Sequence, residues 1–352
     1  STLKSINHHL IFSVFNEETY HIYFYNTDNQ KLNEFIIPDA AIISEQFIEI
    51  DTFNHKVYLG LGVLFSNKAS TYAIFETSYD GIFIDETALP ITKGYIYHSV
   101  RMAVVDKDSS LLIGTYNISK SNKSGNYHTG VYTMTYHDAK ISEPLFLNYS
   151  NLSQNSRQHT AAEKEQIVDL QLLVGDIIAN DSCFSLITEV YYPEYSYSPS
   201  YYDNSSYYYG STYNPAMTTF LGYRYVNAYV TAFDRYGKLL WNNYFPFSNI
   251  ITKRLTRRVS LHYTPYGTAI FYPYNSTLTA TLVNEYEVIE KVGSIPIECL
   301  YKKDVVEYSR DVNMQRWYDN KFVITGYQQI NNNGKSSRGK RYAFFINKLE
   351  YR

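Results

Sequence analysis

Ten tyrosines gathered between positions 191 and 213 are the residues of this sequence best suited to recognition chemistry. A tyrosine ring is large, rigid and apolar, and its hydroxyl group forms hydrogen bonds, so tyrosine is common in binding surfaces. The composition leaves three interpretations open: recognition of a protein partner, packing of the segment on its own domain, and stacking on sugar rings. We predict partner binding by the ten, which are separated by Ser, Asn, Pro and Gly: Tyr191, Tyr192, Tyr195, Tyr197, Tyr201, Tyr202, Tyr207, Tyr208, Tyr209 and Tyr213.

Two carboxylates accompany these tyrosines, Glu189 just before the segment and Glu194 within it. Glycoside hydrolysis uses a pair of carboxylates, and the distance between the two carboxylates determines the reaction mechanism. The spacing of Glu189 and Glu194 in the sequence does not set that distance. A carbohydrate-binding or carbohydrate-active protein, lectin-like or lyase-like, is therefore the alternative function, with Glu189 or a loop histidine as its chemical group.

Residues that could bind a metal ion are present but poorly spaced. His8 and His9 are adjacent, so on a strand they point to opposite faces. Asp106-Lys-Asp108 and Asn26-Thr-Asp28-Asn29 resemble fragments of calcium loops, yet neither continues with the further oxygen ligands that calcium needs. We expect these Asp and Asn residues in tight turns, and we predict no metal site. The other histidines that we considered are scattered: His98, His128, His137 and His159.

No known catalytic signature occurs in the chain. Metalloprotease, nucleophile-elbow, phosphate-loop, dinucleotide-binding and Cys-x-x-Cys patterns are all missing. Cys183 and Cys299 lie among apolar neighbours, which predicts two small buried side chains rather than a disulfide framework. We therefore expect no catalytic residue, no cofactor and a protein that is not an enzyme.

The charge balance is close to neutral, with a formal net charge of -3. Because no positive field surrounds such a chain, we expect no nucleic-acid partner. Two short basic runs, at 253–258 and 335–341, are expected to be solvated charge on loops or edge strands, with a local anion patch as the alternative. No apolar run reaches the length of a membrane-spanning helix. The chain begins at Ser1, which is compatible with export.

The elements that hold these residues follow one pattern, because a two-strand unit recurs along the chain. An apolar strand is followed by a loop and by a second strand rich in Tyr, Phe and Val, which ends in a turn. Such pairs predict β-hairpins. The six pairs are Leu10–Phe15 with Tyr20–Tyr25, Val57–Leu64 with Thr71–Glu76, Leu111–Tyr116 with Gly130–Tyr136, Phe184–Val190 with Asn227–Phe233, Ala269–Tyr272 with Thr277–Val283, and Phe322–Tyr327 with Tyr342–Ile346.

Weaker strands lie between these pairs, at Phe47–Ile50, Tyr95–Tyr97 and Met102–Val105. A hairpin with two further strands makes a four-stranded blade of about 45 to 50 residues. We therefore predict an all-β fold, a single β-propeller domain over residues 1–352 with six or seven four-stranded blades. Two insertions interrupt it: a short helical one at 155–175, with a helix over Ala161–Leu173, and a long Tyr-rich loop at 191–225.

Two motifs carry a resemblance to known families. Segment Thr231–Trp241, with the sequence TAFDRYGKLLW, resembles the blade ends of quinoprotein-type propellers, but the regular Trp repeat of those proteins is missing. The pair Ile113–Tyr116 and Gly130–Tyr132 resembles blade hairpins of exported Bacteroidota propeller proteins. Among these the chain is similar to the Plug component of the type 9 secretion translocon. That resemblance implies a gating subunit that closes a large channel from the periplasmic side, with a large outer-membrane translocon or another envelope complex as its partner. It also implies an exported protein in a periplasmic or outer-membrane-associated location.

Overall fold

The computed structural model describes residues 3–16, 19–36, 40–65, 70–118, 127–155, 170–180, 183–198, 217–274, 276–285, 287–297, 304–318, 320–331 and 339–351. Two compact units make up the chain. Unit 1 is Ser1–Leu170, Asp176–Leu186 and Val230–Asn242, and unit 2 is Gln171–Gly175, Ile187–Tyr229 and Asn243–Arg352. Each unit is described by itself.

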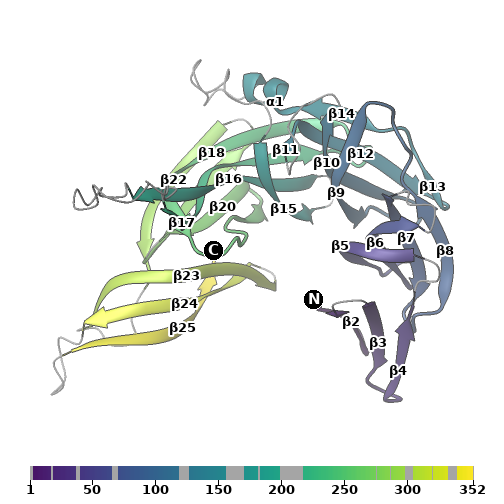
Figure 1. Cartoon of the computed structure of the whole chain (residues 1–352), viewed down its shortest axis with the longest axis horizontal. Helices are drawn as coiled ribbons and strands as arrows, with labels where there is room; N and C mark the ends of the chain where they lie inside the picture. Colours follow the sequence, from purple (N-terminus) through teal and green to yellow (C-terminus); the bar gives the residue numbers. More distant parts are fainter. Residues whose placement is uncertain are drawn as a thin grey trace, which may run out of the picture. The chain divides into compact units, whose positions relative to one another are not determined.

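Unit 1 contains three complete antiparallel sheets, which Figure 1 shows in purple to blue. The first has the order β1 (Leu3–Ile6), β2 (His9–Asn16), β3 (Thr19–Asn26) and β4 (Lys31–Phe35). The second has the order β5 (Ala40–Asp51), β6 (Lys56–Phe65), β7 (Ser70–Ser78) and β8 (Phe83–Ala88). The third has the order β13 (Lys140–Ile141), β12 (Gly130–His137), β10 (Ser110–Ile118) and β9 (Tyr95–Val104), and β14 (Leu145–Asn148) also pairs with β12.

The fourth sheet contributes residues to both units. Its order is β11 (Tyr127–His128), β15 (Leu170–Ala179), β16 (Phe184–Ser198), β17 (Met217–Phe233) and β18 (Leu239–Thr252). Unit 2 holds the remaining two sheets. They are β19 (Ser260–Thr264), β20 (Gly267–Tyr274), β21 (Thr277–Asn284) and β22 (Glu287–Pro296), and β23 (Val305–Tyr318), β24 (Lys321–Asn331) and β25 (Lys340–Glu350).

The prediction of an all-β propeller built from blades is confirmed. The described residues form six antiparallel sheets, and each of the six predicted hairpins supplies two neighbouring strands of one sheet. The weak strands were drawn too short. The predicted strands at Tyr95–Tyr97 and Met102–Val105 are parts of one strand, β9, which ends at Val104 and pairs with β10 across a bulge between Thr115 and Tyr116. The bulge explains the gap in the pattern, because it interrupts the alternation of side chains along the pair.

The structure corrects both insertions. The helix that it describes is α1 (Tyr149–Asn155), and residues 156–169, which hold most of the predicted helix, lie outside the described residues. Leu170–Leu173 belong to strand β15, where Leu172 and Val174 are buried and Gln171 and Leu173 are partly exposed. That alternation has a period of two, whereas the spacing of Leu170 and Val174 alone also fits a helix.

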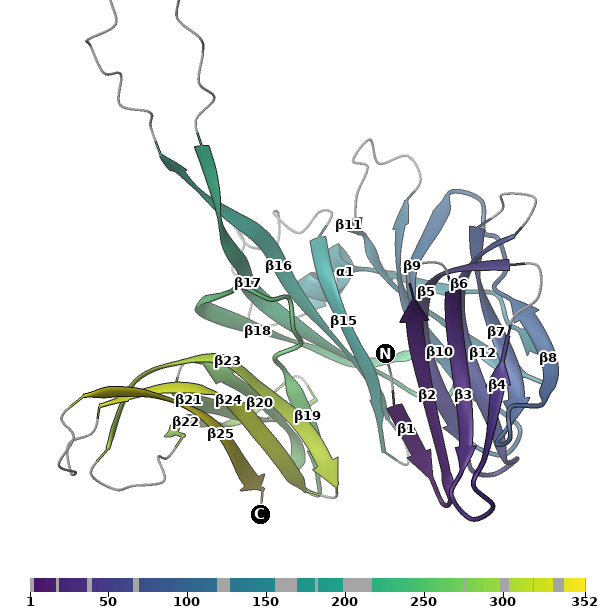
Figure 2. The same ribbon diagram turned by 60° about the horizontal axis from the view of Figure 1, so that its bottom comes forward.

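The predicted loop at 191–225 is strand at both ends. Strand β16 continues to Ser198 and β17 begins at Met217, so only residues 199–216 remain between them, outside the described residues. Figure 2 shows β16 and β17 side by side over this stretch. Tyrosine is frequent in strands because its ring packs on a pleated surface, and a tyrosine-rich composition is therefore compatible with paired strands.

The hydrophobic layer that matters for the site lies in unit 1, between the sheets β5–β8 and β9–β13. Tyr58 and Ile74 from the first sheet pack there with Leu112, Tyr132 and Tyr136 from the second. Gly114 makes room within the second sheet, since a Cβ atom at its position would stand 2.1 Å from the Ser99 carbonyl oxygen of β9 and 2.5 Å from the Tyr132 hydroxyl, closer than any side chain allows. The layer joins the two sheets, and turns from both line one pocket.

Candidate functional site

Two tight turns at the end of this layer are built on aspartates. Asp51 closes β5, and its Oδ1 accepts the backbone N–H groups of Phe53 at 2.8 Å and Asn54 at 3.1 Å. Asp106 follows β9, and its Oδ1 accepts the N–H groups of Asp108 and Ser109, both at 2.9 Å. Asp106-Lys-Asp108 is thus a blade turn, as the sequence predicts. In the described part of the chain, no group of three or more His, Cys, Asp or Glu side chains is arranged to hold a metal ion.

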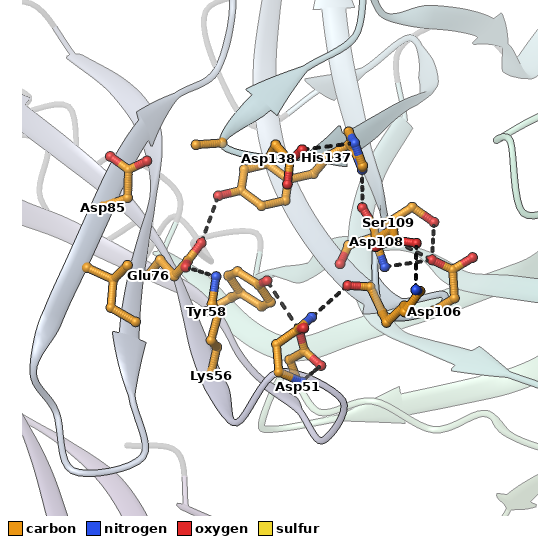
Figure 3. Close-up of a pocket in the computed structure, with 16 residues that line it drawn as sticks. Asp51, Lys56, Tyr58, Glu76, Asp85, Asp106, Asp108, Ser109, His137 and Asp138 are labelled. Atoms are coloured by element: carbon orange, nitrogen blue, oxygen red, sulfur yellow. Dashed lines mark hydrogen bonds and ion pairs between the residues drawn. The ribbon is translucent and has the colours of Figure 1, made fainter.

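These turns enclose a polar pocket of about 450 Å³ (Figure 3). Its volume falls in the range of small-molecule sites. The lining residues come from the β5–β6 turn, β6, β7, β8, the β9–β10 turn, β10, β12 and the turn after β12. They are Asp51, Asn54, Lys56, Tyr58, Glu76, Ile84, Asp85, Asp106, Lys107, Asp108, Ser109, Ser110, Tyr136, His137, Asp138 and Ala139.

The inner part of the pocket couples two tyrosines to two buried carboxylates. The Tyr58 hydroxyl donates to Asp51 Oδ2 at 3.4 Å, and the Tyr136 hydroxyl donates to Glu76 Oε2 at 3.3 Å. Lys56 Nζ forms an ion pair with the other oxygen of Glu76, as Figure 3 shows. The two tyrosine rings meet edge to face, with centroids 5.6 Å apart. Each group is held by another, so the inner wall is pre-organised.

The protonation states make both tyrosines hydrogen-bond donors. Burial, reinforced by the charge of Glu76, raises the pKa of Tyr136 to about 12. Burial and the nearby Glu76 and Asp51 carboxylates also raise the pKa of Tyr58. A phenol with so high a pKa stays protonated at neutral pH, so neither tyrosine is suited to act as a general base there.

The outer part of the pocket consists of more exposed acceptors. Asp85 lies on β8, Asp108 in the β9–β10 turn and Asp138 in the turn after β12 (Figure 3). His137 joins the two turns, since its Nδ1 contacts the Asp108 carbonyl oxygen and its Nε2 lies 3.1 Å from Asp138. Hydrogen bonds from the Asp108 and Ser109 N–H groups, together with the Arg235 guanidinium, hold the pKa of Asp106 below its usual value.

With six acidic side chains against two lysines, the pocket is rich in acceptors and negative overall. Ligand groups that suit it are hydroxyl and amine donors, because O–H and N–H groups form short, strong hydrogen bonds to carboxylates. Phosphate, sulfate or carboxylate groups would be repelled. Lys56 adds donors for ether or hydroxyl oxygens, whereas the hydroxyls of Tyr58 and Tyr136 already donate to Asp51 and Glu76 and can only accept from a ligand. The pocket therefore has the chemistry to bind a polyhydroxylated molecule.

The described tyrosines among those predicted to bind a partner do not line this pocket. Among the described ones, Tyr192 and Tyr195 on β16 are 44% and 48% exposed, and Tyr191 is half-buried. The Tyr191 ring stands edge-on to Tyr223 of β17 at 5.7 Å. Tyr197 lies at the end of β16, with its side chain outside the described residues, as are Tyr201, Tyr202, Tyr207, Tyr208, Tyr209 and Tyr213.

The two glutamates beside these tyrosines do not form a catalytic pair. Glu194 pairs with Arg224 of β17 through two hydrogen bonds, at 2.7 and 2.9 Å. Glu189 is only 1% exposed, and its Oε1 accepts the backbone N–H groups of Arg258 at 2.7 Å and Val259 at 2.9 Å. Each carboxylate therefore has its own structural partner, Glu194 within the β16–β17 ribbon and Glu189 at the segment before β19.

The histidines also occupy separate places. His8 lies 3.0 Å from Asp28 and His9 3.4 Å from Asp80, so the adjacent pair serves two different carboxylates. His98 and His128 are brought together, with ring centroids 4.9 Å apart, which the sequence did not indicate. Burial lowers the pKa of both and keeps them neutral. His159 lies outside the described residues.

Comparisons with known proteins identify no family. No family model matches the chain, and no curated protein matches it either. Among solved structures it is similar to polysaccharide lyase Uly1, with 8% identity and a TM-score of 0.35 over 99% of this chain and 89% of that one. It is also similar to the NanB sialidase from Streptococcus pneumoniae, with 9% identity and a TM-score of 0.37 over 92% of this chain and 47% of that one. A Synechocystis apocarotenoid oxygenase mutant gives 6% identity and a TM-score of 0.38 over 97% and 69%.

These findings correct the prediction that the protein is not an enzyme. The structures with a similar strand arrangement include a polysaccharide lyase and a sialidase, so the non-enzymatic assignment is withdrawn. Likenesses of this size assign no activity in its place. The role in a type 9 translocon and the periplasmic location stay untested predictions. The described residues contain no helix with the length and hydropathy needed to cross a membrane. What the comparisons leave in place is the fold: the chain is an all-β protein built from propeller blades.

Proposed function

We propose that this protein binds carbohydrate, and that the pocket between the sheets β5–β8 and β9–β13 is the binding site. The observation that carries the proposal is the lining itself. Buried Asp51 and Glu76 and the more exposed Asp85, Asp108 and Asp138 present carboxylate acceptors around one cavity of about 450 Å³. Sugars are the common biological ligands that offer many hydroxyl donors within such a volume.

The sugar class follows from the sign of the charge. Six acidic side chains favour a neutral or amino-bearing sugar over a uronate or a sulfated sugar, since like charges repel in a partly desolvated site. Lys56 is already paired with Glu76 and does not reverse this balance. The hydroxyls of Tyr58 and Tyr136 donate to Asp51 and Glu76, so their oxygens add two acceptors for sugar hydroxyl groups.

The experiment that tests the proposal is glycan-array binding of the full chain and of two pocket variants, Asp85→Asn and Asp138→Asn. Asparagine keeps the size of each side chain and removes its charge. At Asp138, where φ is 47°, it also tolerates the left-handed backbone. We expect neutral or amino sugars among the wild-type ligands, and weaker signals from both variants.

Glu86→Gln is the matched control. Glu86 is exposed, follows Asp85 on β8 and does not line the pocket, because neighbouring residues of a strand point to opposite sides. Equal loss of signal in the control and in Asp85→Asn would show that the pocket does not select the ligand. A wild-type protein that binds only acidic glycans would contradict the proposed sugar class.

A further inference from the structure

Unit 2 contains a second pocket, of about 400 Å³, whose charge is opposite to that of the first. Its walls come from the end of β18 and the segment before β19, from β20 and from β23. The lining residues are Ile250, Ile251, Thr252, Lys253, Arg254, Arg258, Tyr274, Ser309, Arg310, Asp311 and Val312. Lys253, Arg254 and Arg258 belong to the basic run that the sequence suggested to be solvated charge.

Cations dominate this lining. Lys253, Arg254, Arg258 and Arg310 stand against a single acid, Asp311. In the described part of the chain, none of these four cations lies within ion-pair distance of a carboxylate. Four cations around one cavity repel one another, and a bound anion relieves that repulsion.

Arg258 is the most informative of the four because it is buried. Only 5% of it is exposed, and its guanidinium group donates through Nη1 to the Val312 carbonyl oxygen at 3.0 Å. Its Nε has no hydrogen-bond partner. The nearby Glu189 does not supply one: its Oε1 accepts the backbone N–H groups of Arg258 and Val259, and its Oε2 has no hydrogen-bond partner. A buried cationic donor without an acceptor is costly, and a ligand that supplies the acceptor recovers that cost.

An irregularity of the backbone determines the direction of the Arg310 side chain. The β23–β24 register shifts between Arg310 and Asn313, and Asp311 between them has φ of 50°. Such a bulge redirects the side chains beside it. The Arg310 guanidinium lies over the rings of Tyr327 and Tyr342, at 5.6 and 5.7 Å from their centroids. The rings restrict the guanidinium and leave its N–H edge free for an acceptor.

From these contacts we propose that the pocket formed by Lys253, Arg254, Arg258 and Arg310 is an oxyanion-binding site, for a carboxylate, sulfate or phosphate group. Arginine suits such groups because its planar N–H fork matches two oxygens at once. Arg254 and Arg310 contact the ligand from the exposed side, and Arg258 meets it from the buried side. This site is separate from the carbohydrate pocket, and the inference goes beyond the proposed function.

The test is calorimetric titration of the full chain with sulfate, inorganic phosphate and glucuronate at constant ionic strength, with chloride as the reference anion. We expect saturable binding of at least one oxyanion. Arg258 is buried and its loss could unfold unit 2, so the variants are the exposed Arg254→Gln and Arg310→Gln. Loss of one charge-assisted hydrogen bond weakens binding by about tenfold, so each variant should lose about that much.

Arg316→Gln is the matched control, since Arg316 is an exposed arginine on the same strand as Arg310 that does not line the pocket. Its affinity for the oxyanion should equal that of the wild type.

Tighter binding of glucuronate than of phosphate would identify an acidic sugar as the ligand source, and the reverse would identify a phosphorylated molecule. No saturable binding of any of the three anions, or equal losses in Arg310→Gln and Arg316→Gln, would overturn the proposal. Asp85→Asn should leave oxyanion binding unchanged, which separates this site from the first.

Discussion

Replacing Glu189 by glutamine should stabilise the protein at alkaline pH, because burial makes ionisation of the Glu189 carboxyl group unfavourable. Burial is the largest influence on it and raises its pKa from the ordinary value of 4.5 to about 7, although Arg258, Val259 and Arg257 act in the opposite direction. Its Oε2 has no hydrogen-bond partner. The folded state therefore holds a proton on Glu189 at a pH where the unfolded chain has released it.

The sign and size follow from this difference. A group whose pKa is raised on folding stabilises the folded state below the unfolded pKa, and this contribution is lost as pH rises through the folded pKa. The two pKa values, 4.5 and about 7, differ by about 2.5. At about 1.4 kcal/mol for each unit, the full loss is about 3 kcal/mol, and about 2.5 kcal/mol of it falls between pH 5 and pH 8.

Glu189→Gln removes this titration while keeping an oxygen for the Arg258 and Val259 N–H groups. Relative to wild type, the variant should gain about 2.5 kcal/mol between pH 5 and pH 8. Urea unfolding at both pH values, followed by circular dichroism, measures the difference. Glu49, whose pKa burial also raises to about 7, is present in both proteins and cancels from the comparison. Parallel pH profiles for the two proteins would refute the reasoning.

Three further predictions concern the scaffold. Gly114→Ala should lower the free energy of unfolding by about 3 kcal/mol, as overpacking of a filled core does, because its Cβ would stand 2.1 Å from the Ser99 carbonyl oxygen; urea unfolding checks this. Asp234→Ala should cost about 1 to 2 kcal/mol, since its Oδ1 accepts two backbone N–H groups of the β17–β18 turn at 2.8 and 2.9 Å, and thermal unfolding measures the loss. Glu194→Ala should speed proteolysis of the β16–β17 ribbon by removing both acceptors of its two bonds to Arg224, whereas unchanged cleavage would show that the pair does not hold the ribbon.

The strand pairs could be predicted from the sequence because their signal is local. Apolar runs such as Leu111–Tyr116, followed by a turn and a second strand, suffice to identify a hairpin, and β10 and β12 pair in the structure as that pattern indicates. The helix at Ala161–Leu173 was wrong at its described end because Leu170 and Val174 fit both a helical and an alternating pattern. Pairing in the fourth sheet decides between them, and pairing is not local.

The candidate pocket could not be predicted, because its residues become neighbours only when two blades pack. Asp51 and Asp138 are far apart in the chain, and only the Asp106-Lys-Asp108 turn drew attention in the sequence. The sequence nevertheless contains one signal that could have located the pocket. Acidic residues recur where a strand ends in a blade turn, as at Asp51 and Asp106, and turns at the same end of adjacent blades share one rim.

The burial of individual charged side chains could not be predicted from the sequence either. Glu189 was placed as an available carboxylate at a strand end, yet the N–H groups that bind it belong to Arg258 and Val259, about seventy residues later. The same contact moves Arg258 from a solvated basic run into the wall of a pocket. Long-range contacts of this kind change the chemistry of a side chain without leaving a mark on its immediate neighbours in the sequence.

The most direct test of carbohydrate binding is a calorimetric titration of three proteins with one neutral or amino-bearing oligosaccharide chosen from the glycan array. The proteins are the wild type, the Asp85→Asn/Asp138→Asn double variant and the Glu86→Gln control. We predict that the wild type and the control bind with equal affinity, and that the double variant binds about a hundredfold more weakly, as loss of two charge-assisted hydrogen bonds implies. Equal affinity in all three proteins would contradict the assignment of the pocket as the carbohydrate site.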